Sequence, residues 1–137
     1  MIKSINHIGI AVKDLHKSAE LFQKIFGFEH FHKEIVEDQK VEIASFNVGR
    51  VKIELTAPIN QDSPIFKFIE KRGEGIHHIA FEIDALEDEL SKLKSMGIQL
   101  INENPVEGAH NMLIAFLHPK STNGVLIELC QLKKEKN

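Results

Sequence analysis

The amino-acid sequence predicts an α+β fold in which two tandem βαβββ repeats share one curved sheet that encloses a cavity. Two observations predict this fold. The segment around His7 returns around His78, 71 positions later, and the segment around Glu54 returns around Glu128, 74 positions later. A helical stretch that ends in a glycine also follows each histidine segment in nearly the same register. Each repeat therefore places one histidine near its beginning and one glutamate near its end.

The length of 137 residues fits one ordinary domain, which we predict to span 1–137. Two halves of about 60 residues would hardly be stable apart, so the repeats should share one core. We place repeat one at about 5–57, a connector at 58–75 and repeat two at about 76–132.

The first repeat begins with an alternating segment, residues 5–12, which is typical of a strand with His7 on its small-residue face. Asp14 is expected to cap a helix with apolar residues at helical spacing, and Gly27 is expected to end it. Further strands are expected at 28–36, 40–48 and 50–57.

The second repeat has the same order of elements. A strand at 76–83 leads to Asp84 as a helix cap, and Gly97 ends that helix. Further strands are expected at 98–103, 111–118 and 124–132. In the connector, the pair Ser63-Pro64 predicts the beginning of a short helix.

The composition excludes several classes of protein. Hydrophobic residues make up 42% and charged residues 27%, which is typical of a soluble globular chain, and the apolar runs are shorter than the ~20 residues of a membrane span. A net charge of -3 gives no general attraction to nucleic acid or to anionic membranes. The single cysteine, Cys130, suits a reducing compartment, and the N-terminus lacks the apolar region of a signal peptide. We therefore expect a cytoplasmic protein without nucleic-acid or membrane partners.

The duplicated histidines and glutamates suggest a metal site. A single strand histidine is usually structural, and Glu54 alone could be an ordinary solvent-facing residue. Glu128, however, has apolar neighbours on both faces of its strand, and an isolated buried charge would cost several kcal/mol. Two histidines and two glutamates at equivalent points suit a borderline divalent cation such as Co²⁺, Ni²⁺, Zn²⁺, Fe²⁺ or Mn²⁺.

The sequence resembles the vicinal oxygen chelate superfamily, which includes glyoxalase I and the extradiol dioxygenases, and over essentially its whole length the methylmalonyl-CoA epimerase family. The resemblance is carried by four segments: residues 6–12, residues 53–55 with 62–65, residues 76–80, and residues 116–121 leading to 124–129. The most specific parts are the double histidine and the run from His118-Pro119-Lys120-Ser121 to the strand of Glu128.

The resemblance implies a glyoxalase-like fold and a metal-dependent epimerase that inverts C2 of methylmalonyl-CoA through a metal-stabilised enolate. The implied metal ligands are His7, Glu54, His78 and Glu128. The implied ion is Co²⁺, with Zn²⁺, Mn²⁺ and Ni²⁺ as alternatives. The implied quaternary structure is a homodimer.

The resemblance also implies the residues that act on the substrate. Glu42 and Glu128 would be the two bases, which need pKa values raised toward neutrality. Lys120 and Ser121 would either orient the substrate carboxylate or only form the turn before the last strand.

Three other functions remain open from sequence. A glyoxalase I-type lactoylglutathione lyase shares the ligand set and the metal-assisted proton transfer. A ring-cleaving dioxygenase could use His7, His78 and Glu128 as its triad, although this chain has no tyrosine and Glu54 would crowd the open positions. The third is a non-catalytic small-molecule binding protein.

Overall fold

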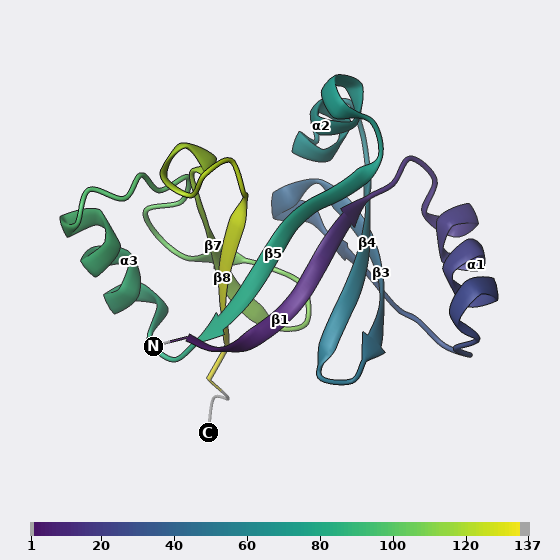
Figure 1. Ribbon diagram of the computed structural model, residues 1–137, viewed down its shortest axis with the longest axis horizontal. Helices are drawn as coiled ribbons and strands as arrows, with labels where there is room; N and C mark the ends of the chain where they lie inside the picture. The colour runs from purple at the N-terminus through teal and green to yellow at the C-terminus, as the bar shows by residue number, and fades with distance from the viewer. Residues whose placement is uncertain (1, 135–137) are drawn as a thin grey trace. The chain divides into compact units, whose positions relative to one another are not determined.

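The computed structural model describes residues 2–134, so residues 1 and 135–137 of the predicted domain lie outside it. The described chain forms two compact units (Figure 1). The first unit is His7–His77, and the second comprises residues 2–6 together with 78–134. No helix among residues 2–134 is both long and apolar enough to cross a membrane.

The first unit is a four-stranded sheet with the neighbour order β2-β3-β4-β1. Its elements are β1 (Ile2–Ala11, shared with the second unit), α1 (Leu15–Phe26), β2 (His32–Val36), the 3₁₀ turn η1 (Glu37–Gln39), β3 (Val41–Val48), β4 (Val51–Pro58) and α2 (Pro64–Arg72). Strands β1 and β4 are parallel, whereas β3 is antiparallel to both β2 and β4.

Helix α1 forms where the sequence predicts it. The Asp14 side chain accepts a hydrogen bond from the Lys17 backbone N–H, and Gly27 ends the helix at φ 73°. The apolar side of α1 packs on β3 and β4, with Leu15 and Ala19 buried against Leu55 (Figure 1). Helix α2 begins at the predicted Ser63 cap, whose hydroxyl accepts from the Ile65 N–H.

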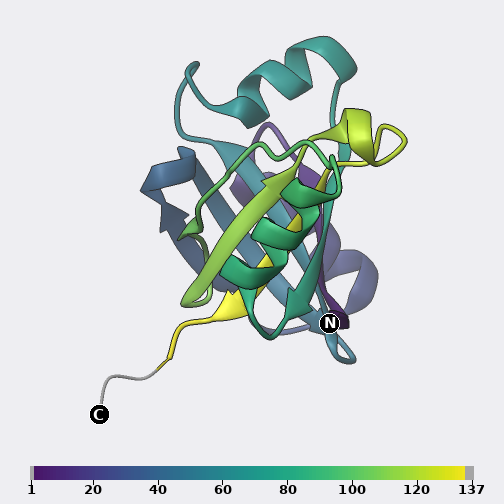
Figure 2. The ribbon, with the colours of Figure 1, turned by 90° about the vertical axis from the view of Figure 1, so that its left-hand side faces the viewer.

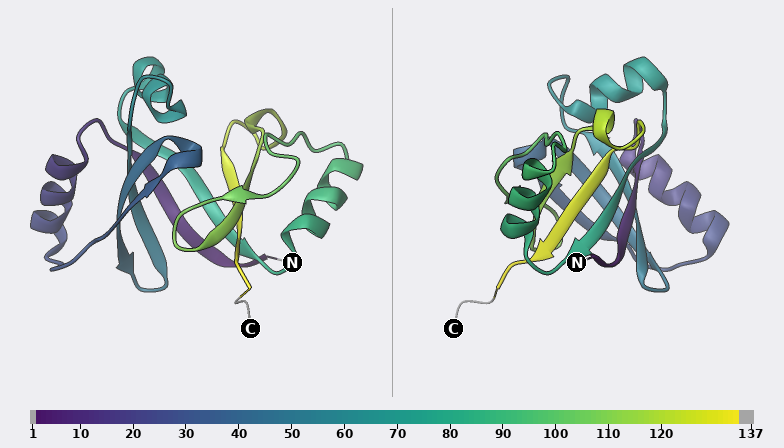
Figure 3. Two further views of the ribbon diagram at one scale, coloured as in Figure 1. Left: turned by 180° about the vertical axis from the view of Figure 1, so that it is seen from behind. Right: turned by 60° about the vertical axis from the view of Figure 1, so that its left-hand side comes forward.

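The second unit repeats this plan with the neighbour order β1-β5-β8-β7-β6. Its further elements are β5 (Gly75–Ile83, which begins in the first unit), α3 (Leu86–Ser95), β6 (Val106–Glu107), β7 (Met112–Leu117), the 3₁₀ turn η2 (Pro119–Ser121) and β8 (Ile127–Leu132). Helix α3 covers one face of β7 and β8 (Figure 2). Strand β8 lies between β5, to which it is parallel, and β7, to which it is antiparallel (Figure 3).

The predicted strand at 98–103 is wrong, because this segment has only an isolated bridge between Leu100 and Leu117. Its backbone groups bond irregularly instead: the N–H groups of Ile101 and Asn102 both donate to the Phe116 carbonyl. The strand that pairs with the outer edge of β7 is β6, which forms only after this irregular segment.

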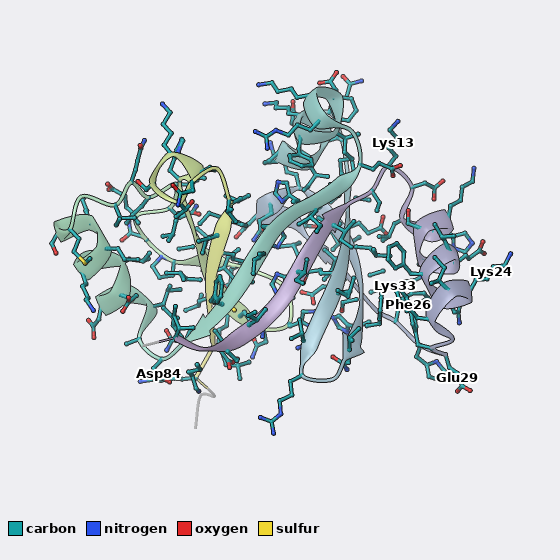
Figure 4. The ribbon with its side chains drawn as sticks, in the orientation of Figure 1. Lys13, Lys24, Phe26, Glu29, Lys33 and Asp84 are labelled. Carbon is teal, nitrogen blue, oxygen red and sulfur yellow. The ribbon has the colours of Figure 1, made fainter. Side chains whose placement is uncertain are left out.

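The predicted cap of the third helix is also wrong. Asp84 lies after β5 (Figure 4) and pairs with Lys3 at 3.4 Å, and α3 has Ala85 at its cap position without a side-chain hydrogen bond. The first N–H of the helix, that of Leu86, instead donates to the Gln131 side chain from β8. A tertiary contact therefore replaces the local cap.

Two strands begin later than predicted. Strand β2 begins at His32, because Phe28 before it stacks on Phe46 at 4.0 Å between ring centroids rather than joining the ladder. Strand β8 begins at Ile127, because the Gly124 N–H closes a turn onto the Pro119 carbonyl.

Candidate metal and proton-transfer site

The first unit pairs His7 with Glu54 on two neighbouring strands. Glu54 of β4 lies beside Gly9 of β1, and His7 is two residues before Gly9, so alternation puts both side chains on one sheet face. His7 Nε2 and Glu54 Oε2 are 3.7 Å apart, and each residue is only 6% exposed. We call the side of each sheet that carries such a pair its donor face.

The second unit repeats this arrangement. Glu128 of β8 lies beside Ala80 of β5, and His78 is two residues before Ala80. His78 Nε2 and Glu128 Oε1 are also 3.7 Å apart, and both residues are buried. The internal repetition of the sequence therefore corresponds to two histidine–glutamate pairs with the same geometry.

The opposite face of each sheet is the helix face. In the first unit it carries Leu55 and Ala57 against α1, and in the second unit Leu129 against α3. Glu54 and Glu128 therefore alternate with core residues on their strands. Burying such a carboxylate is costly unless a cation, a proton or hydrogen bonds compensate for it.

The two pairs have donors that suit a divalent cation. Imidazole nitrogen and carboxylate oxygen are ligands of first-row divalent metals. At 3.7 Å, each nitrogen–oxygen separation is too long for a hydrogen bond. Two ligand atoms that each lie ~2.1 Å from one ion would be roughly 3–3.5 Å apart, which is close to this spacing. The residues present thus fit the metal that the sequence resemblance implies.

Burial changes the titration of two groups in the first unit. It raises the pKa of Glu54 from 4.5 to about 7, and the nearby Glu34 carboxylate adds to this effect while Lys52 opposes it. His77, whose ring meets Phe68 of α2 edge-on at 4.8 Å, has its pKa lowered from 6.5 to about 4 by burial and by Arg72. Glu54 is therefore a carboxyl that is half-protonated near neutral pH when no cation is bound.

We expect the metal-free protein to become less stable, through Glu54, as the pH rises from 4.5 to 7. In this window the folded protein binds a proton at Glu54 that the unfolded chain has released, so the free energy of unfolding falls with pH, by roughly 3 kcal/mol in total. The Glu54→Gln variant should lack this contribution. Urea unfolding of both proteins across this pH range, in the presence of a chelator, measures it.

The effect of Glu54 must be taken as the difference in free energy of unfolding between the wild-type protein and Glu54→Gln, because His77 changes stability with pH in the opposite direction. Its lowered pKa makes the folded protein more stable as the pH rises from about 4 to 6.5. This contribution is present in both proteins and cancels in the difference. Parallel stability curves for the wild-type protein and Glu54→Gln would contradict the assignment to Glu54.

Glu42 lies away from the histidine–glutamate pairs. It is exposed on β3, where it pairs with Ala57, a residue of the helix face, whereas Glu54 pairs with Ser45. Because residues 42 and 45 are separated by an odd number of positions, their side chains point to opposite faces of the sheet. The strand register therefore does not bring Glu42 together with Glu54, and its role as a base stays a prediction.

Lys120 and Ser121 lie in η2, between β7 and β8. The Ser121 hydroxyl accepts a hydrogen bond from the Gln99 N–H at 2.9 Å, and the Lys120 N–H donates to His118 Nδ1. Both contacts stabilise the turn, while the Lys120 side chain is exposed. A contact of either residue with substrate stays a prediction.

Two residues that sequence reasoning missed lie directly opposite the glutamates. Ser45 of β3 is the cross-strand neighbour of Glu54, and Phe116 of β7 is the neighbour of Glu128. Ser45 is buried although it is polar. The signal was available in the sequence, because Ser45 and Phe116 are 71 positions apart, as His7 and His78 are.

Comparison with known proteins identifies the family. Residues 6–116 match the glyoxalase/bleomycin resistance protein/dioxygenase superfamily. The chain is 43% identical to an uncharacterised Bacillus subtilis protein, YqjC, over 97% of this chain and 95% of that protein. It is 38% identical to human mitochondrial methylmalonyl-CoA epimerase over 93% of this chain and 73% of the human protein.

A solved structure gives the same result. The structure of a methylmalonyl-CoA epimerase in complex with methylmalonyl-CoA and NH₄⁺ matches with a TM-score of 0.91 and 35% identity, covering 96% of each chain. This similarity confirms the predicted glyoxalase-like fold of two βαβββ repeats. The chain therefore belongs to the glyoxalase/bleomycin resistance protein/dioxygenase superfamily and, within it, to the methylmalonyl-CoA epimerase family of enzymes.

Proposed function

We propose that the protein interconverts the R and S forms of methylmalonyl-CoA by removing the proton at C2 and returning it to the opposite side. The observation that carries this proposal is the buried histidine–glutamate pair that recurs in both units of a chain from the methylmalonyl-CoA epimerase family. The related epimerase structure with bound methylmalonyl-CoA supports the choice of substrate.

The reaction requires a base and a means of stabilising negative charge. The C2 hydrogen lies between a thioester carbonyl and a carboxylate, so its removal leaves an enolate. We propose His7, Glu54, His78 and Glu128 as ligands of one divalent cation, with Co²⁺ as the expected ion. When bound, such a cation supplies Lewis-acid stabilisation of the developing oxyanion charge.

We propose Glu128 as one of the two bases. Its carboxylate is buried beside Ala80 and Phe116, and an apolar environment favours proton uptake by a carboxylate. Inversion also needs a group that returns a proton to the other side of C2. The family resemblance suggests Glu42 for this task, but Glu54, unlike Glu42, lies on a donor face. Variants at these two positions distinguish them.

The decisive experiment follows deuterium entry from D₂O into C2 of (R)- and (S)-methylmalonyl-CoA by NMR, with and without Co²⁺. We expect cation-dependent exchange together with loss of chirality. A Glu42→Gln or Glu54→Gln variant that still exchanges but no longer inverts would identify the second base. Absence of exchange in the metal-loaded wild-type protein would overturn the proposal. Turnover of a glutathione hemithioacetal would then indicate a lactoylglutathione lyase.

A homodimer and a cytoplasmic location stay predictions.

A further inference from the structure

The two units differ at the position opposite the glutamate. Across the first sheet, Glu54 lies between Gly9 and Ser45, whereas across the second sheet Glu128 lies between Ala80 and Phe116. The histidine and the glutamate are the same in both repeats. The residue opposite the glutamate is a small buried hydroxyl in one unit and an aromatic ring in the other.

Phe116 contacts the donor pair of its own unit. Its ring meets the His78 imidazole edge-on, with centroids 5.7 Å apart and an interplanar angle of 86°. The ring also packs on a buried apolar cluster on the same donor face, which includes Met112 and Ile114. Phe116 itself is only partly buried, although it contacts His78 and is the cross-strand neighbour of the buried Glu128.

The chemistry of the proposed substrate suggests what this ring does. The C2 atom carries a hydrogen, a carboxylate, a thioester carbonyl and a methyl group, of which only the methyl group is an apolar substituent. A carboxylate packed against Phe116 would lose hydrogen bonds to water, whereas a methyl group would not. An apolar wall beside a proton-transferring carboxylate is therefore suited to the alkyl group.

We propose that Phe116 is a specificity-determining residue that packs against the alkyl substituent at C2 and limits its size. This inference rests on the proposed epimerase function and adds the group that selects among 2-alkylmalonyl thioesters. Discrimination of one methylene in an apolar pocket typically amounts to about 10–200-fold in kcat/KM. Truncating the Phe116 side chain should remove much of that discrimination.

The test is a competition between methylmalonyl-CoA, ethylmalonyl-CoA and propylmalonyl-CoA in one D₂O solution, with deuterium at C2 followed by mass spectrometry. The relative rates report the ratios of kcat/KM directly. We expect Phe116→Ala to raise the ethyl-to-methyl ratio at least ~10-fold over the wild-type value, and the propyl-to-methyl ratio further. Phe116→Leu keeps most of the side-chain volume, so its ratios should lie between those of the wild-type protein and those of Phe116→Ala. This second variant also covers the case in which the alanine variant does not fold.

The matched control is Phe81→Ala. Phe81 belongs to β5 of the same unit but packs on the helix face, so its truncation lowers stability without changing the ratios. Equal loss of activity toward all three thioesters in both Phe116 variants, with unchanged ratios, would overturn the proposal and leave Phe116 a structural support of His78. A wild-type protein that exchanges none of the three would instead overturn the proposed function, and this inference with it.

Discussion

Replacement of Glu128 by glutamine is expected to lower the rate of C2 proton exchange by about 10²–10⁴-fold, the usual contribution of a positioned general base. Glutamine keeps the shape of the side chain at this 3% exposed position between Ala80 and Phe116, so the fold should persist. An amide cannot accept the C2 proton at neutral pH. Deuterium incorporation into methylmalonyl-CoA at saturating Co²⁺ measures the loss.

Saturating Co²⁺ is needed because Glu128 has two proposed roles, as a base and as a metal ligand. If the activity of Glu128→Gln stays low when the variant is saturated with Co²⁺, the loss is due to impaired proton transfer and not to lost metal. The control is Glu103→Gln, which removes an exposed carboxylate that pairs with Lys94 at 3.1 Å and should leave exchange unchanged. A Glu128→Gln variant with wild-type exchange would show that Glu128 is not a base.

The second large effect is expected for metal binding. We expect His7→Ala and His78→Ala each to weaken Co²⁺ binding by more than about 100-fold, because each would remove a direct ligand of one shared ion. Calorimetric titration of metal-free protein, together with metal analysis after dialysis, measures both affinity and stoichiometry. The wild-type protein should bind a single ion per chain.

This experiment also separates one shared ion from two independent half-sites. If each histidine–glutamate pair held its own ion, His7→Ala would lose only half of the bound metal and His78→Ala the other half. The control is His16→Ala, which removes an exposed α1 histidine that pairs with Glu20 at 2.9 Å. Partial loss in both single variants would contradict the shared ion.

The sequence alone predicts the repeats and the histidine–glutamate pairs because both rest on strand alternation and internal matching. The internal match gives each repeat one histidine and one glutamate, and α1 could be bounded by Asp14 and Gly27 because those caps are local. These features depend on nearby residues, which a sequence displays directly.

The features of the fold that sequence reasoning missed depend on distant partners. The cap of α3 comes from Gln131, 45 positions after the N–H that it accepts. The backbone of residues 98–103 bonds to the end of β7 instead of forming a ladder. Whether Glu42 faces the same side as Glu54 depends on how β3 pairs with β4, a register that the segment around Glu42 does not specify.

The division of β1 between the two units has a consequence for the order in which the chain can fold during synthesis. The first unit, His7–His77, is a continuous stretch and can pack as soon as it has left the ribosome. The second unit needs residues 2–6 together with residues 78–134, so the beginning of β1 must wait at least for β5, its neighbour in the sheet. Its closure is a high-contact-order event, and the N-terminal half of β1 remains an unsatisfied strand edge until β5 has been synthesised and has packed beside it.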